Sequence, residues 1–390
     1  MWFVRLALFA MAVASPPASL LAAPPVPDGI RVERLPFADL PGWAGDDHAA
    51  AWQVFLGSCR SVIDETPSLR QGLTPPQPLI DRCREALAVG ATGASQAKLF
   101  FEERFEAWKI LGPEGHAFFT GYYEPEVEGS LVREGRYQSP LYGRPDDLVS
   151  FEPGQSPPGL DTYAAARRRP DGGLEPYADR KAIEDGALDG KGLERAWLAD
   201  PVDRFFMQVQ GSGRVRLPGG GVVRLSYAGR NGHPYTGIGR VVADWTGTPR
   251  SEMSMAKLRS LLARDAGWAR DVMHQNKSFV FFKFADLDPE LGPIGGQGLP
   301  LTPLRSIAVD RTLWPYGLPV FIDTALPDVP GVRKGPVRRL TIAQDTGSAI
   351  LGAARADIFF GSGEHAGSRA GRVRHAATMF VLVPLSGMRG

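Results

Sequence analysis

The chain has 390 residues, of which 43% are hydrophobic and 22% charged, so a sizeable core is possible and global disorder is excluded. Lys and Arg number 44 against 43 Asp and Glu, a balance that argues against a nucleic-acid binder, which normally shows a basic excess. The 46 Gly and 34 Pro residues interrupt helices too often for a helical bundle. The composition therefore predicts many short strands joined by turns.

The first 23 residues have the layout of a secretory signal peptide. Arg5 precedes an apolar stretch at residues 6–14, and small residues follow up to Ala22 and Ala23. A membrane anchor is the alternative, but the apolar run is too short to span a bilayer, and no later stretch reaches about 18 apolar residues. We expect cleavage after Ala23, with Ala14 as the other candidate, and no transmembrane anchor in the mature chain.

Cys59 and Cys83 lie in the same N-terminal helical region. In an oxidising, exported compartment such a pair predicts a disulfide, which would stabilise the fold by ~3 kcal/mol in the chain-entropy model. Two buried free thiols are the alternative. Neither cysteine belongs to a CxxC or Cys/His pattern, so no redox or zinc site is predicted.

Helices are expected first along the chain. One carries its apolar face at residues 51–58, where Asp46 or Asp47 is a candidate cap, and a stronger helix is expected over residues 94–111, ended by Gly112 and Pro113. Residues 117–123 predict a strand, residues 203–228 a β meander, and residues 253–263 and 268–274 two amphipathic helices. Further strands are expected at residues 279–284, 307–309, 320–323, 338–344, 357–360 and 378–383.

Three aspartates lie at the ends of predicted C-terminal strands: Asp310, Asp345 and Asp357. The apolar residues that follow Asp357 predict partial desolvation of its carboxyl group and hence a raised pKa, which a general acid needs near neutral pH. Turn or cap residues are the alternative reading of all three. The six histidines show no metal-ligand spacing, and the chain has no GxSxG elbow or phosphate loop, so no metal or cofactor is predicted.

Asp345, Thr346 and Gly347 also spell the tripeptide of aspartic proteases. Those enzymes need two such aspartates that share one proton. This chain has one such tripeptide, since Asp310 is followed by Arg and Thr. A protease would therefore need an irregular second half or a dimer.

Four motifs follow one another along the chain: Phe119-Thr120-Gly121-Tyr122-Tyr123-Glu124-Pro125, Gln208-Val209-Gln210-Gly211-Ser212-Gly213, Tyr227-Ala228-Gly229-Arg230-Asn231-Gly232-His233 and Asn276-Lys277-Ser278-Phe279-Val280-Phe281-Phe282. Together with the three aspartates, they resemble the membrane-bound lytic murein transglycosylase A family and its C-terminal three-aspartate (3D) domain. The resemblance covers roughly residues 115–383.

The resemblance implies a mainly β fold with two domains, a few N-terminal helices and a substrate groove between the domains. Residues 24–125 and 286–390 would form a discontinuous double-ψ β-barrel that carries the catalytic aspartate. Residues 126–285 would form a smaller, inserted β-barrel.

The implied reaction cleaves the β-1,4 bond between N-acetylmuramic acid and N-acetylglucosamine in peptidoglycan, leaving 1,6-anhydro ends, in cell-wall turnover and remodelling. The nucleophile is the muramic C6 hydroxyl, which the substrate itself holds at high effective molarity. One carboxyl group therefore suffices, whereas a hydrolase needs a second. No cofactor is implied.

By the same resemblance, Asp357 is the acid/base, Asp345 a supporting aspartate and Asp310 mainly structural. The predicted glycan groove is formed from two sides by Thr120, Gly121, Tyr122 and Tyr123, and by Gln210, Gly211, Ser212 and Gly213. Core packing is the alternative role for the two tyrosines. A murein hydrolase that uses Asp345 with Asp357, or a peptidoglycan-binding protein without turnover, are the alternative functions.

The family name implies an anchored lipoprotein, but the first cysteine is Cys59, so a lipidation site is not supported. We expect Sec-type export to the periplasm, with the protein either free or peripheral to the outer membrane. Its expected partners are peptidoglycan glycan strands, with other cell-wall enzymes as further candidates and no nucleic acid.

Overall fold

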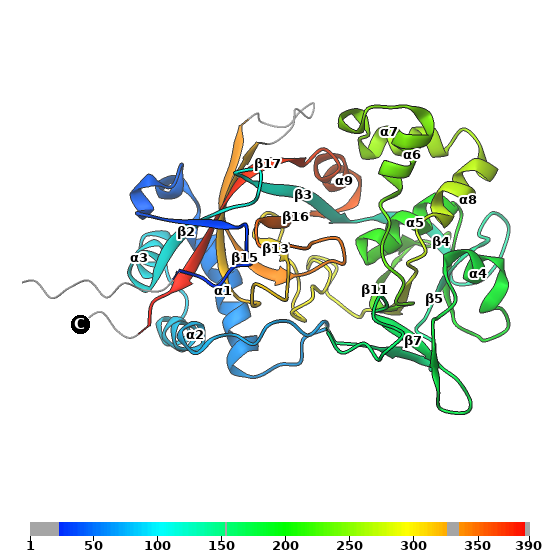
Figure 1. Ribbon diagram of the computed structural model, residues 1–390, viewed down its shortest axis with the longest axis horizontal. Coiled ribbons are helices and arrows are strands. Elements are labelled where there is room, and N and C mark those ends of the chain that lie inside the picture. The colour runs from blue at the N-terminus through cyan, green and yellow to red at the C-terminus, as the bar shows by residue number, and fades with distance from the viewer. Residues whose placement is uncertain (1–22, 153, 326–334, 387–390) are drawn as a thin grey trace, which may run out of the picture.

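The computed structural model describes residues 23–152, 154–325 and 335–386. The predicted signal peptide, residues 1–23, lies outside these ranges except for its last residue. The molecule has two lobes along its long axis (Figure 1). The blue-cyan beginning and the orange-red end of the chain share one lobe, and the green to yellow middle forms the other.

The first lobe is built on a sheet of eight strands in the order β1-β2-β17-β14-β15-β13-β16-β3. An additional pairing of β17 with β3 closes six of these strands into a barrel. The strands are β1 Arg31–Leu35, β2 Phe105–Leu111, β3 Ala117–Glu124, β13 Ser306–Val309, β14 Pro319–Ala325, β15 Pro336–Asp345, β16 Arg355–Ser362 and β17 Arg374–Pro384. The closed barrel, built from both ends of the chain, confirms the predicted fold class.

Helices pack around this barrel and enlarge its core. They are α1 His48–Ile63, α2 Gln77–Val89, α3 Ala94–Arg104 and α9 Gly363–Ala370, with short 3-10 turns at Phe37–Asp39 and Trp43–Gly45. The Asp47 side chain caps α1 by accepting a hydrogen bond from the Ala50 N–H at 3.0 Å. A disulfide between Cys59 and Cys83 joins α1 to α2.

The second lobe contains a six-stranded sheet in the order β12-β11-β10-β4-β9-β5. A bridge between Gly143 and Phe282 links its two edges, so the sheet curls into a small barrel. Its strands are β4 Glu126–Ser130, β5 Ser139–Tyr142, β9 Glu194–Leu198, β10 Ser212–Arg216, β11 Val222–Arg230 and β12 Val280–Phe284, and a separate sheet holds β6 Leu148–Ser150, β7 Ala165–Arg168 and β8 Leu174–Glu175. The helical elements are α4 Arg180–Ala182, a π turn at Ile183–Ala187, α5 Pro201–Gln210, α6 Ile238–Thr246, a 3-10 turn at Arg250–Glu252, α7 Met255–Leu262 and α8 Ala266–His274.

The predicted helix over residues 94–111 is wrong in its second half. Helix α3 ends at Arg104, and β2 begins at Phe105. Most residues of β2 are buried on both faces of the strand, while its two edges pair with β1 and β17. A short apolar run of this kind has no periodicity that separates a buried strand from a buried helix.

The predicted meander at residues 203–228 is also wrong in part. Its first third is helix α5, which starts after Asp200, whose side chain accepts the Val202 N–H at 2.7 Å. Gly211 ends the helix in the left-handed conformation, with φ +83°. Only the remainder forms the expected antiparallel pair, β10 with β11.

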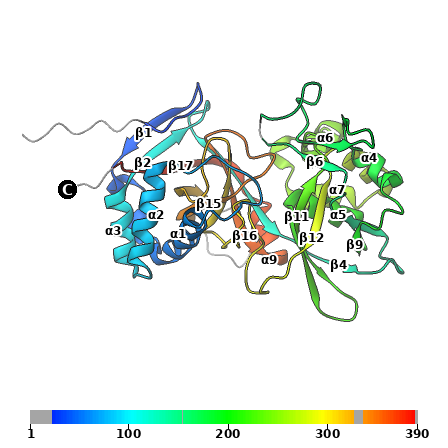
Figure 2. The ribbon, with the colours of Figure 1, turned by 90° about the horizontal axis from the view of Figure 1, so that it is seen from below.

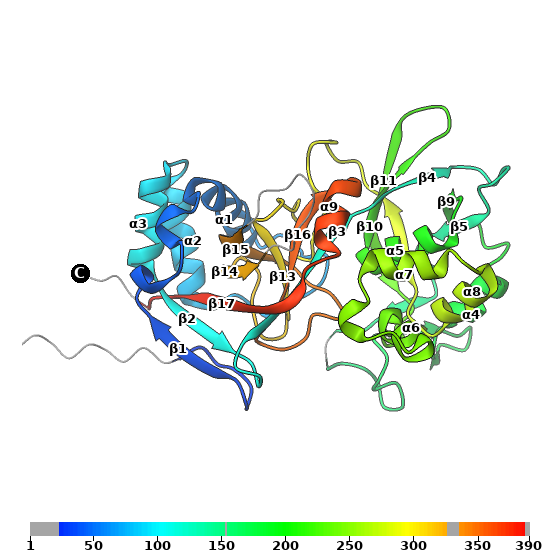
Figure 3. The same cartoon turned by 90° about the horizontal axis from the view of Figure 1, so that it is seen from above.

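Buried ion pairs fix the passage between the lobes. Strand β3 leaves the first barrel and the chain enters β4 of the second lobe almost at once (Figure 2 and Figure 3). At the end of β3 the fully buried Glu124 pairs with Arg214 and Arg224 of the second lobe, each at 2.9 Å, and accepts the Ser362 hydroxyl at 2.6 Å. Breaking such a buried pair is strongly destabilising, so the two lobes are held in a defined relation.

Candidate active site

A pocket of about 360 Å³ lies between the two lobes. Seven of the residues that the sequence predicts for the site line this pocket: Thr120, Gly121, Tyr122, Gln210, Gly211, Asp345 and Asp357. Tyr123, Ser212 and Gly213 are not part of its lining. The first lobe supplies both aspartates, and helix α5 of the second lobe brings its C-terminal end to the opposite wall.

Asp357 is held in the middle of the barrel wall. Strand β16 places it opposite Thr120 of the parallel strand β3 and opposite Ala308 of β13. The Thr120 hydroxyl donates to the Asp357 carboxylate at 2.7 Å and accepts from the Arg355 guanidinium at 2.7 Å. This chain of hydrogen bonds fixes the direction in which the carboxyl group points.

The pKa of Asp357 is raised to about 6, mainly because burial disfavours the charged form. Arg355 and the Thr120 hydrogen bond oppose the rise, and the negative charge of Asp345 adds to it. A carboxyl group with this pKa holds its proton in about half of the molecules at about pH 6 and in about a tenth at pH 7, far more than an ordinary aspartate does. It can therefore give a proton to a leaving group and later accept one.

Asp345 lies in the same pocket but has a different environment. One of its oxygens accepts the N–H groups of Gly296 at 2.7 Å and Thr346 at 2.8 Å, and the other accepts the Tyr122 hydroxyl at 2.8 Å. Burial raises its pKa, against the opposing charge of Arg70 and these hydrogen bonds. Because both oxygens have protein donors, Asp345 is suited to hold loops and influence Asp357 rather than to activate water.

Asp310 holds loops together outside this pocket. One oxygen accepts the Thr312 N–H at 3.0 Å and the Thr312 hydroxyl at 2.7 Å, and the other accepts the Gly352 N–H at 2.7 Å. The carboxyl group is thus used to tie the turn after β13 to the loop before β16. This placement is in keeping with the mainly structural role predicted for it.

The Gly121 and Tyr123 positions are shaped by helix α9. A Cβ atom at Gly121 would lie 2.9 Å from the Ala370 backbone, so the absence of a side chain lets α9 pack against β3. The Tyr123 ring packs against Gly367 of the same helix, and burial raises its pKa. The Tyr123 N–H donates to Gln210 at 3.1 Å, which connects the two sides of the groove.

Ser212 and Gly213 begin strand β10 beneath the groove. Ser212 is buried, and a Cβ atom at Gly213 would lie within 3 Å of the Met207 side chain. The second motif therefore contributes Gln208, Gln210 and Gly211 to the pocket, while its last two residues lie against the second lobe's own core.

Sequence reasoning missed several charged and aromatic residues of the pocket. Among them are Arg70, Arg180, Tyr227, Tyr235 and Arg355. Arg355 lies two residues before Asp357 on one strand, so the alternation of a β-strand would have placed it on the same face. Tyr227 belongs to a quoted motif, whereas Arg70 lies in a segment between α1 and α2 that has no motif.

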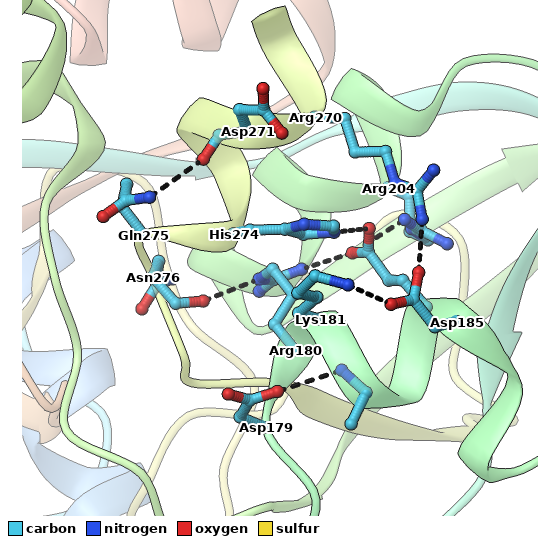
Figure 4. A network of polar contacts seen from close by, with 12 residues as sticks. Asp179, Arg180, Lys181, Asp185, Arg204, Arg270, Asp271, His274, Gln275 and Asn276 are labelled. Atoms are coloured by element: carbon cyan, nitrogen blue, oxygen red, sulfur yellow. Dashed lines mark hydrogen bonds and ion pairs between the residues drawn. The ribbon is translucent and has the colours of Figure 1, made fainter. Parts of the chain in front are cut away.

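A buried charge network supports the second lobe's wall of the pocket (Figure 4). The Arg180 guanidinium, almost fully buried, donates to the carbonyl of Asn276 at 2.9 Å and to the Gln208 side chain at 2.6 Å, and it pairs with Glu184 at 3.2 Å. The Glu184 carboxylate also contacts the Arg204 guanidinium at 2.8 Å and the His274 ring nitrogen at 3.1 Å. Burial alone would raise the pKa of Glu184, but the hydrogen bond from His274 and the charges of Arg204 and Arg180 lower it to about 2.

Among the described residues, no group of three or more His, Cys, Asp or Glu side chains is arranged to hold a metal ion. In that same part of the chain, no helix combines the length and apolarity needed to cross a membrane. The polar features of the pocket are thus carboxyl, hydroxyl, amide and guanidinium groups.

A groove between two β lobes, with two buried aspartates of raised pKa among tyrosine, glutamine and arginine side chains, is suited to an acid/base enzyme of the kind that cleaves glycans. The comparisons agree with this class. The family model for the MltA specific insert domain matches residues 118–283, and that for the 3D domain matches residues 305–383. The insert match covers most of the second lobe, and the 3D match covers all three aspartates: Asp345 and Asp357 in strands β15 and β16, and Asp310 directly after β13.

Two curated relatives are named membrane-bound lytic murein transglycosylase A. The protein of Escherichia coli K12 is 33% identical over 282 residues, which are 71% of this chain and 69% of that protein. The protein of Vibrio cholerae is 31% identical over 272 residues, 69% of this chain and 66% of the relative, so the aligned part leaves about a third of each relative unmatched.

Solved structures show the same arrangement. The membrane-bound lytic murein transglycosylase of Agrobacterium tumefaciens has a TM-score of 0.81 and 35% identity, covering 90% of this chain and 97% of that one. Escherichia coli MltA with bound chitohexaose has a TM-score of 0.62 and 28% identity, covering 86% of this chain and 90% of that one. The chain belongs to the membrane-bound lytic murein transglycosylase A family.

Proposed function

We propose that this protein is a peptidoglycan lytic transglycosylase that cleaves the β-1,4 bond between N-acetylmuramic acid and N-acetylglucosamine and leaves a 1,6-anhydro end. The single observation that carries the proposal is the Asp357 carboxyl group, which lies in the pocket between the lobes with its pKa raised to about 6. Family membership supports the substrate class.

In the first half of the reaction, protonated Asp357 donates its proton to the glycosidic oxygen, and the bond to the anomeric carbon breaks. The muramic C6 hydroxyl attacks that carbon, and the Asp357 carboxylate takes the hydroxyl proton. The acid is thereby regenerated without water. Because the C6 hydroxyl belongs to the same sugar, its attack is intramolecular and needs no second carboxylate.

The environment of Asp345 favours this route over hydrolysis. A hydrolase needs a second carboxylate with an oxygen free to bind water or to attack the sugar. In this pocket Asp345 accepts from Gly296, Thr346 and Tyr122, so each of its oxygens already has a protein donor and only about one of its lone-pair positions is left for water. We assign it the supporting role of raising the Asp357 pKa through its charge.

For the groove, we propose that Thr120, Tyr122, Gln210 and Gly211 contact the glycan, since they line the pocket around Asp357. We propose domain boundaries at residues 24–125 with 286–390, and at 126–285. Supporting them, β3 ends at Glu124 in the first sheet and β4 begins at Glu126 in the second. We further propose export to the periplasm, with peptidoglycan strands and other cell-wall enzymes as partners.

The test is release of soluble muropeptides from purified murein by the mature protein and by Asp357→Asn. We expect release by the wild type and a loss of at least about a thousandfold in the variant, which should still bind murein. Asp244→Asn, the same substitution at an exposed position of helix α6 outside both cavities of the groove, is the matched control and should release muropeptides normally. Substantial turnover by Asp357→Asn would place the acid elsewhere.

A further inference from the structure

A second cavity, of about 810 Å³, continues the groove away from Asp357. It shares Arg70, Tyr227, Arg230 and the 346–348 loop with the pocket around Asp357, so the two form one continuous channel. The lining of this second cavity includes four half-buried arginines: Arg70, Arg144, Arg230 and Arg311. Nothing in the proposed reaction requires this positive charge.

The hydrogen-bond and ring partners of Arg70, Arg144 and Arg311 are neutral, although the charge of Arg70 also acts on Asp345. Arg70 lies 4.0 Å above the Tyr227 ring and donates to the Thr346 carbonyl at 3.0 Å, and Arg311 donates to the Gln71 carbonyl at 2.6 Å. Arg144 donates to the carbonyls of residues 148 and 228 and to a serine hydroxyl at position 150. Within the described ranges, none of the four forms an ion pair with a carboxylate.

Other buried arginines in the described chain are paired. Arg82 pairs with Glu85 at 2.9 Å, Arg224 with Glu124 at 2.9 Å and Arg305 with Asp46 at 2.8 Å. The buried arginines of the described chain are therefore all paired with carboxylates, whereas the four half-buried arginines of the second cavity are not. Gathering like charges in a partly desolvated place costs free energy unless an anion offsets it.

Arg230 shows that cost most clearly. Burial and the neighbouring charges of Arg70 and Arg311 lower its pKa, against the opposite effect of Tyr227. Three carboxylates also line the cavity, Glu152, Asp161 and Asp310. Asp310 accepts hydrogen bonds from its own loops and Asp161 accepts the Gly159 N–H at 3.1 Å. In the part of the chain that the structure describes, none of the three carboxylates forms an ion pair with an arginine of the cluster, so the lining carries one more positive than negative group.

We propose that the arginine cluster, Arg70, Arg144, Arg230 and Arg311, binds carboxylate groups on the lactyl-peptide arm of a muramic acid residue in the strand being cleaved. Guanidinium groups bind carboxylates in a planar, two-bond geometry, which the neutral sugar rings do not offer. In a glycan strand only the muramic residue bears such groups, as its lactyl carboxyl or as the carboxyls of the attached peptide. The assignment rests on the proposed function and adds a substrate preference to it.

The test measures binding to protein carrying Asp357→Asn, which removes turnover. Three probes are compared: chitohexaose, which is uncharged; peptide-free murein strands, which carry lactyl carboxylates; and strands with intact peptides. Arg311→Gln and Arg230→Gln are each introduced, and Arg168→Gln, exposed on β7 outside both cavities, is the control with the same charge change.

We expect Arg311→Gln and Arg230→Gln each to weaken binding of a carboxylate-bearing probe about tenfold, with chitohexaose binding changed less than about twofold. Loss on peptide-free strands alone identifies the lactyl carboxylate, which the attached peptide converts into an amide. Loss on peptide-bearing strands alone identifies the peptide carboxylates, and loss on both charged probes means that the cluster accepts either. Equal losses on all three probes, or no loss on any, would overturn the assignment.

A second measurement does not depend on how the variants fold. With all four arginines intact, binding of the charged probe should weaken severalfold between low and physiological salt, while chitohexaose binding should not. Identical salt dependence for the two probes would also overturn the assignment. If the wild type cleaves murein to anhydro products but the probes bind alike, only this inference fails; if it gives no such products, the proposed function itself fails.

Discussion

Replacing Asp357 by Asn should stabilise the folded protein while it abolishes catalysis. The folded-state pKa of Asp357 is about 6 against an ordinary value of 3.8, because burial disfavours the carboxylate. The difference is about two pKa units, and each unit corresponds to about 1.4 kcal/mol. At neutral pH and above, the wild type therefore loses up to about 3 kcal/mol of stability that a neutral asparagine would not lose.

The direction in which the stability of the wild type changes with pH follows from proton binding to Asp357 in the folded and unfolded chains. Between about pH 4 and pH 6 the unfolded chain has released the Asp357 proton and the folded chain still holds it. The wild type thus loses stability as pH rises through this window, and the loss is complete above about pH 6. The asparagine side chain can still accept the Thr120 hydroxyl, so the hydrogen bond itself is kept.

The assay is denaturant unfolding of both proteins at pH 4, 6 and 8. We expect the variant's advantage to be near zero at pH 4 and to rise to between about 1 and 3 kcal/mol at pH 8. Asp310→Asn is the control with the opposite sign, because it removes an acceptor from Thr312 or Gly352 and should destabilise. An Asp357→Asn variant that is less stable than wild type at pH 8 would refute the reasoning.

Three further predictions concern the groups around the acid and the fold beneath it. The kcat/KM of murein cleavage should fall as pH rises above about 6, because Asp357 then loses its proton. This fall should shift to higher pH in Arg355→Gln, since Arg355 lowers the pKa of Asp357, and to lower pH in Asp345→Asn, since Asp345 raises it. Identical pH profiles for the wild type and the two variants would contradict this prediction. Tyr122→Phe should lower the free energy of unfolding by about 1–3 kcal/mol, because a buried carboxylate loses its hydroxyl donor, and chemical denaturation measures the loss. Cys83→Ser should lower it by about 3 kcal/mol, and a reducing agent should destabilise the wild type but not this variant.

Local signals in the sequence predict much of the architecture. The aspartates at positions 345 and 357 lie at the end and near the start of strands, as expected, because polar residues that interrupt apolar runs mark strand boundaries. The closed barrel has no local signal. Its β16–β3 contact joins Asp357 to Thr120 across 237 residues, and the motif resemblance alone indicated that these segments meet.

Errors in the predicted elements have physical causes as well. Residues 105–111 are mostly buried on both faces of β2, although Glu106 and Lys109 are charged, and burial of this kind removes the alternation that identifies a strand. Helix α5 does have local signals: Asp200 and Pro201 mark its start and Gly211 marks its end. The prediction of a β meander did not use these signals. No pattern in the sequence predicts that Arg70 lines the pocket, because it belongs to an irregular segment whose position depends on tertiary packing.

The central claim is that a single carboxyl group, Asp357, suffices because the nucleophile belongs to the substrate. The most direct measurement is the mass of muropeptides released from purified murein by the mature protein, with the reaction run in ¹⁸O-labelled water. We predict products one water lighter than those of a murein hydrolase, with no label incorporated. Products with ordinary, labelled reducing ends would contradict the claim and would make Asp345 the first candidate for a water-activating group.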